Sequence, residues 1–123
     1  MRTFAITALI ASIAATPAAA MDVATFLLKV DALKTKGILA PLSGDYKSLM
    51  AELDDSGKAL RAERLAAQAA GGKPAYCPPA RNPPAPNEIF SGLHAIPAPQ
   101  QTQVQVKDAL RALYSKKYPC PAA

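Results

Sequence analysis

The chain has 123 residues, half of them hydrophobic, a net charge of +5, one histidine and two cysteines. This length is typical of a single domain. Neither C-x-x-C nor H-x-x-x-H spacing occurs, which excludes the common metal and haem attachment motifs, so we expect no metal site and no cofactor.

The first twenty residues have the pattern of a signal peptide. Arg2 gives a positive start, an apolar run follows over residues 4–15, and Ala18-Ala19-Ala20 fits the A-x-A cleavage pattern. A membrane anchor is the competing interpretation, but it needs about 20 apolar residues, and this run is shorter. We therefore expect residues 1–20 to be removed, which leaves residues 21–123 as one mature domain without a membrane span. The protein would be periplasmic or secreted.

Two helices are predicted in the first half of the mature domain. Asp22 can cap a helix that Gly37 ends, and its apolar stripe consists of Val23, Phe26, Leu27, Val30 and Leu33. Ser43 can cap a second helix that reaches Ala70 and stops at Gly71-Gly72. The stripe of this second helix consists of Tyr46, Leu49, Met50, Leu53, Gly57 and Leu60. Since Gly57 lies where a large side chain is expected, we predict either a close helix crossing or a bend there.

The composition changes between Lys73 and Pro99, where eight of the twelve prolines lie and a long helix or central strand is excluded. Within this segment we predict a short helix capped by Asn87 and ended by Pro97, with Ile89, Phe90, Leu93 and Ile96 on its apolar face.

A last helix is predicted from Pro99 to about Lys117, with a buried stripe of Val106, Ala109, Leu110, Leu113 and Tyr114. The alternation at residues 103–106 is too short to favour a strand, although Val104 has no place on the helical stripe. The fold class is therefore all-α: a small four-helix domain with a proline-rich loop before the third helix.

The two cysteines lie far apart in the sequence, Cys77 inside the proline-rich loop and Cys120 just beyond the last helix. In an exported protein two cysteines most often pair with each other, so we expect one internal disulfide, with a reactive or intermolecular thiol as the alternative. The bridge would hold the last helix against the loop and secure the end of the chain.

The residues that carry catalysis in other proteins are sparse here. His94 has no obvious partner, and a bridged Cys77 could not supply a thiolate to a Cys-His pair. Asp54 and Asp55 point about 100° apart on a helix, so they cannot converge on one substrate, and we expect Asp54 or Asp55 to support Lys58 instead. No glycine-rich phosphate loop is present. We expect no catalytic residue: the protein is predicted to act by binding and not as an enzyme.

The segment from Cys77 to Cys120 resembles the Rap/Tai family of small periplasmic immunity proteins, which neutralise peptidoglycan amidase effectors delivered by type VI secretion. The shared features are Cys77-Pro78-Pro79, the helix end at Leu93 and Ile96-Pro97, Ala109-Leu110, and Tyr118-Pro119-Cys120, with a weaker match at Phe26-Leu27. The resemblance implies an all-helical domain with one internal disulfide, often a homodimer, that blocks an amidase by inserting a loop or helix into its cleft. The proline-rich segment 82–86 and the long second helix depart from the family pattern.

Our leading hypothesis is a periplasmic inhibitor or immunity-like protein whose stiff loop contacts a partner through Lys73, Tyr76, Arg81 and Asn82. The rival is a non-catalytic envelope protein that binds anionic cell-wall polymer, because residues 73–123 carry six basic and two acidic side chains. No nucleic-acid partner is expected. A carrier of small ligands is the third possibility, but the seven aromatic residues leave little material for a specific pocket.

Overall fold

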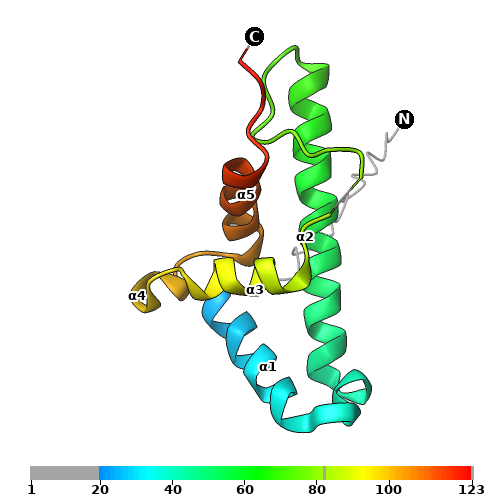
Figure 1. Cartoon of the computed structure of the whole chain (residues 1–123), viewed down its shortest axis with the longest axis vertical. Coiled ribbons are helices and arrows are strands. Elements are labelled where there is room, and N and C mark those ends of the chain that lie inside the picture. The colour runs from blue at the N-terminus through cyan, green and yellow to red at the C-terminus, as the bar shows by residue number, and fades with distance from the viewer. Residues whose placement is uncertain (1–19, 82, 123) are drawn as a thin grey trace, which may run out of the picture.

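A computed structural model of the protein describes residues 20–81 and 83–122. The predicted signal peptide falls almost entirely on residues 1–19, outside the described part, and Asn82 and Ala123 lie outside it as well. The described ranges confirm the all-α class, because they contain no β-strand (Figure 1). In chain order the elements are α1 (Val23–Lys36), the 3₁₀-helix η1 (Gly37–Leu42), α2 (Gly44–Ala69), α3 (Pro86–His94), α4 (Ala98–Gln101) and α5 (Val106–Lys117).

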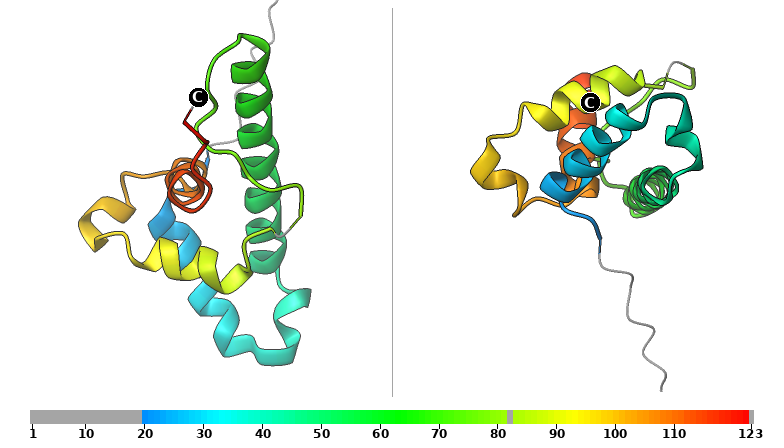
Figure 2. Two further views of the ribbon diagram at one scale, coloured as in Figure 1. Left: turned by 45° about the horizontal axis from the view of Figure 1, so that its top comes forward. Right: turned by 90° about the horizontal axis from the view of Figure 1, so that it is seen from below.

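Helix α2 forms the long axis of the molecule. Its 26 residues correspond to a length of about 39 Å at 1.5 Å per residue. The right-hand view of Figure 2 looks along α2 and shows the other helices gathered on one side of it. One half of α2 therefore packs against α1 and the other half against α5, while α3 crosses between them (Figure 1).

The first two helices begin and end as predicted. The Asp22 Oδ1 atom accepts a hydrogen bond of 2.8 Å from the Thr25 amide, and this bond lowers the pKa of the Asp22 carboxyl. The Ser43 Oγ atom likewise accepts from the Tyr46 amide at 3.2 Å. Gly37 and Gly71 follow the two helices with φ of 53° and 74°, a left-handed conformation that glycine adopts without steric cost.

Of the two alternatives predicted for Gly57, the close helix crossing is wrong. Helix α2 continues through Gly57 without a break, and a Cβ atom added there would meet nothing within 4 Å. The close helix contact lies instead at Gly92, where an added Cβ atom would stand 2.7 Å from Leu113 Cδ1. Gly92 thus lets α3 approach α5, which the sequence pattern did not indicate.

The predicted start of the third helix is also wrong, by two residues. Helix α3 begins at Pro86, and Ala85 is its N-cap, so Asn87 lies inside the helix. Proline fixes φ near the helical value and needs no hydrogen-bonded N–H at the first position, while the residue before it is held extended. These two effects move the start of the helix upstream of the polar residue that sequence reasoning selected.

The predicted single helix from Pro99 to Lys117 is in fact two helices. Helix α4 ends at Gln101, and α5 begins at Val106. Between them, the Val104 carbonyl accepts a hydrogen bond of 2.9 Å from the Val23 amide, and the Val106 amide donates to the Met21 carbonyl at 2.9 Å. The first amides of α1 and α5 have no partners within their own helices, so the two segments satisfy each other. This exchange explains why Val104 lies off the helical stripe.

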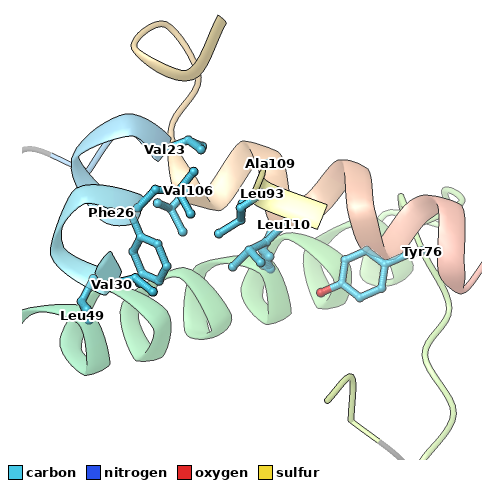
Figure 3. Packing of buried hydrophobic residues seen from close by; sticks show 11 residues of the cluster. Val23, Phe26, Val30, Leu49, Tyr76, Leu93, Val106, Ala109 and Leu110 are labelled. Carbon is cyan, nitrogen blue, oxygen red and sulfur yellow. The ribbon is translucent and has the colours of Figure 1, made fainter. Parts of the chain in front are cut away.

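The hydrophobic core lies where α1, α2, α3 and α5 meet (Figure 3). Its largest fully buried side chains are Phe26, Leu60, Leu93, Leu110, Val23 and Val106. None of the described helices combines the length and the apolar character that crossing a membrane requires.

The predicted disulfide between Cys77 and Cys120 is confirmed, with the two Cα atoms 4.8 Å apart. Beside it the Cys77 amide donates a hydrogen bond of 2.9 Å to the Tyr118 carbonyl. The proline-rich loop is therefore fastened at its start to the segment that follows α5.

Candidate functional site

A groove of about 290 Å³ lies between the middle of α2, the proline-rich loop and the end of α5. Three arginines line it, Arg61 and Arg64 from α2 and Arg81 from the loop, and none of the side chains around it is acidic. We call this feature the arginine groove. Arg61 and Arg64 share one face of α2 because residues three apart are neighbours on a helix. The groove therefore collects positive charge from two segments that are distant in the sequence.

Tyrosine rings form the inner wall of the arginine groove. The rings of Tyr76 and Tyr114 lie 5.4 Å apart, and those of Tyr114 and Tyr118 lie 6.4 Å apart. The Arg64 guanidinium carbon lies 5.5 Å from the centroid of the Tyr76 ring, a cation–π arrangement. Burial raises the pKa of the Tyr76 and Tyr114 hydroxyls, so both stay protonated at neutral pH.

The outer wall is the loop after Cys77, and its backbone has little freedom. Four prolines, Pro78, Pro79, Pro83 and Pro84, line the groove on this side, and each fixes its own φ. The disulfide holds the start of the loop, and α3 begins soon after the last of these prolines. A second hollow of about 380 Å³ shares Arg64 and part of this wall. The loop thus presents a preformed surface that loses little entropy when it binds a partner.

The basic side chains of α5 are largely neutralised by acidic neighbours. The Arg111 guanidinium makes two hydrogen bonds to Glu63, of 2.9 and 2.8 Å, and Lys107 Nζ lies 3.2 Å from the same carboxylate. Burial acts against ionisation of Glu63, but the hydrogen bonds from Arg111 and Lys107 outweigh it and lower the Glu63 pKa. Lys117 pairs with Glu88, and the hydrogen bond between them lowers the pKa of the Glu88 carboxyl.

The distribution of ion pairs leaves the arginine groove as the main concentration of uncompensated positive charge. Among residues 20–81 and 83–122, six basic side chains form no salt bridge: Lys47, Arg61, Arg64, Lys73, Arg81 and Lys116. Three of these six line the groove. An anionic group is therefore the ligand that this surface favours.

The structure describes three of the four residues that the sequence suggested for partner binding, and it places them differently. Arg81 lies in the groove and is exposed, and Lys73 is exposed at the start of the loop but does not line the groove. Tyr76 is only 6% exposed, since its ring packs at one end of the core between α2 and α5 (Figure 3). Tyr76 therefore lines the groove from within and leaves little of its surface for contact with a partner. Asn82 lies outside the described residues.

Sequence reasoning missed Arg61, Arg64, Tyr114 and Tyr118 as groove residues. A signal exists for the two arginines, which are three apart and so occupy one face of α2. Tyr114 lies on α5, and Tyr118 directly follows the last residue of that helix. What spacing alone could not provide is the packing of α5 beside α2, which brings the arginines and the tyrosines to the same place.

Two residues considered for catalysis, Asp54 and His94, lie on different helices, α2 and α3. His94 is exposed at the end of α3, and the Asp54 carboxylate pairs with Lys58 Nζ at 2.5 Å, as predicted from their spacing. In the part of the chain that the structure describes, no group of three or more His, Cys, Asp and Glu residues could hold a metal ion.

Comparison with known proteins adds no relative: no family model, no curated protein and no solved structure matches the chain. The similarity to Rap/Tai immunity proteins thus depends on the residues quoted above, and it enters the functional argument as a hypothesis.

Proposed function

We propose that the protein is a non-catalytic, exported binding protein that holds an acidic segment of a partner protein in the arginine groove. The observation that carries this proposal is the convergence of Arg61, Arg64 and Arg81 on a tyrosine wall with no acidic side chain among them. Arginine and tyrosine are the residue types that contribute most at the centres of protein interfaces. A guanidinium also binds a carboxylate through two parallel hydrogen bonds, which gives orientation as well as affinity.

The disulfide supports the exported location in this proposal. Structural disulfides persist in oxidising compartments such as the periplasm. The bridge between Cys77 and Cys120 fastens the start of the loop whose prolines line the arginine groove. The similarity to the Rap/Tai family makes a peptidoglycan amidase the first candidate partner. An inhibitor of this kind would place its rigid, proline-rich loop in the cleft of the enzyme and fix it there through the three arginines.

The direct test is inhibition of a peptidoglycan amidase encoded beside this protein's gene. We expect the purified, disulfide-bonded protein to bind the amidase and to slow release of peptides from peptidoglycan. The double variant Arg61→Ala with Arg81→Ala should weaken binding at least about tenfold, since hydrogen bonds to charged groups contribute about 1.5 to 3 kcal/mol each. Both side chains are exposed, so their removal should leave the fold intact.

The matched control is Lys116→Ala with Lys47→Ala, which removes the same number of exposed positive charges outside the groove. This control should change the affinity less than about twofold. Equal weakening by the two double variants would show a diffuse charge effect and would refute the groove as the binding site. If no amidase encoded nearby binds, the immunity role is abandoned.

The rival, binding of anionic cell-wall polymer through α5, has less support because Lys107, Arg111 and Lys117 are already engaged with carboxylates. Sedimentation with purified peptidoglycan at low and high salt distinguishes it from the leading proposal. Pelleting that salt abolishes, and that Lys116→Ala reduces while Arg61→Ala does not, would favour the rival.

A further inference from the structure

A second candidate site lies at the other end of α2, away from the arginine groove. It is a pocket of about 340 Å³ lined by residues of α1, η1, α2 and α3, and we call it the apolar pocket. Phe26, Leu49 and Phe90 form its floor, and Tyr46, Met50 and Lys34 lie at its rim. Figure 1 shows the elements that contribute its lining: α1 and α2, which η1 joins, and α3, which crosses between α1 and α5.

The floor of the apolar pocket belongs to the hydrophobic core itself. Phe26 has no exposed surface, Leu49 is 3% exposed, and the rings of Phe26 and Phe90 lie 6.4 Å apart. At the rim, by contrast, Met50 is 42% exposed. The pocket thus has partly exposed apolar side chains over a fully buried layer, so an apolar group that covered them would be removed from water.

The size and lining of the pocket suit a small molecule. Sites for small ligands usually have volumes of about 300 to 1,000 Å³ and mostly apolar and aromatic walls. An apolar cavity of only about 150 Å³ is known to stay dry and to bind benzene. Three aromatic side chains, Phe26, Tyr46 and Phe90, converge here. The sequence alone had suggested too little aromatic material for a ligand pocket. The three residues come from three different helices, so only the folded structure shows that they converge.

Lys34 gives the pocket a positive charge at its rim, since it is the single charged side chain in the lining. Its Nζ atom lies 2.9 Å from Asp31 Oδ1, and both side chains are more than half exposed. An exposed pair of this kind contributes little to stability, so the ammonium group can exchange its partner for an anion on a ligand.

From this arrangement we infer that the apolar pocket binds a single-chain amphiphile with a hydrocarbon tail and a carboxylate head group. The tail would lie against Phe90, Tyr46 and Met50, and the head group would meet Lys34 at the rim. A volume of about 340 Å³ fits one slender chain better than a helix of a partner protein, which is about 10 Å across with its side chains. The site shares no residue with the arginine groove, so the inference does not depend on the proposed function.

Calorimetric titration of the purified, disulfide-bonded protein with decanoate and with decanol tests this inference, because the two probes share a tail and differ in charge. We expect saturable binding of both and tighter binding of decanoate. Lys34→Gln should weaken decanoate about tenfold, which corresponds to about 1.4 kcal/mol, and should leave decanol unchanged. The control Lys47→Gln removes an exposed lysine of α2 that does not line the pocket, and it should change neither affinity.

Ala40→Phe places a ring into the pocket and should abolish binding of both probes. If that variant does not fold, Met50→Glu at the exposed rim serves the same purpose, since it puts a negative charge beside the tail. The inference is overturned by absence of saturable binding at millimolar decanoate, or by equal effects of Lys34→Gln and Lys47→Gln. It is also overturned if sedimentation shows that the pocket is covered by a second copy of the protein and decanoate does not compete.

Discussion

Removal of the disulfide should cost a large share of the stability of this domain. The cysteines are 43 positions apart, so the bridge closes a loop of 44 residues that contains α3, α4 and α5. For a loop of that length, the reduction in unfolded-state entropy corresponds to about 4 kcal/mol at 25 °C. Small domains unfold with only about 5 to 15 kcal/mol in total. We therefore expect Cys77→Ala with Cys120→Ala to lower the free energy of unfolding by about 3 to 4 kcal/mol.

Urea unfolding followed by circular dichroism measures this loss. The wild type should lose the same stability on addition of a reductant, whereas the double variant should not respond to the reductant at all. The hydrogen bond from the Cys77 amide to the Tyr118 carbonyl does not require the bridge. The loop should therefore still pack against the segment after α5, but it should detach from that segment more often. A loss below about 1 kcal/mol would refute the reasoning, because it would mean that the unfolded chain is already restricted in this region.

Two further predictions test packing and electrostatics. Gly57→Ala should raise the free energy of unfolding by about 0.5 to 1 kcal/mol in urea titrations, because the helix gains propensity and nothing lies near the new methyl group. The matched change Gly92→Ala must displace Leu113 and should be less stable than Gly57→Ala by about 1 kcal/mol or more, and equal effects would contradict the close approach of α3 to α5. Because the Glu63 pKa is lowered in the folded state, the stability from its pair with Arg111 is present above about pH 4.5 and is lost as the pH falls below that value. In thermal melts from pH 3 to 7, Glu63→Gln should reduce the fall of the melting temperature toward acid pH. If the melting temperature of the variant depends on pH as that of the wild type does, the pair contributes nothing.

The sequence by itself determined the helical class, the two N-terminal helices and the disulfide. These features depend on local or compositional signals that tertiary contacts did not override: Asp22 and Ser43 as caps, Gly37 and Gly71 as left-handed stops, and two cysteines behind an apparent signal peptide.

Only the tertiary structure decided the details that depend on contacts between distant segments. The helix predicted through Val104 is interrupted because the amides of Val23 and Val106 find partners across the chain. The crowded glycine is Gly92 and not Gly57, since crowding depends on where α5 passes and not on an apolar stripe.

The arginine groove and the apolar pocket also depend on tertiary structure and not on sequence pattern alone. Each is built from side chains of three or four elements that packing brings together, such as Arg61 with Arg81, or Phe26 with Tyr46. Periodicity assigns a residue to a face of its own helix, but it carries no information about which face of another helix lies opposite. The choice of partner faces is made by the burial of the whole core, and so both sites exist only in the folded chain.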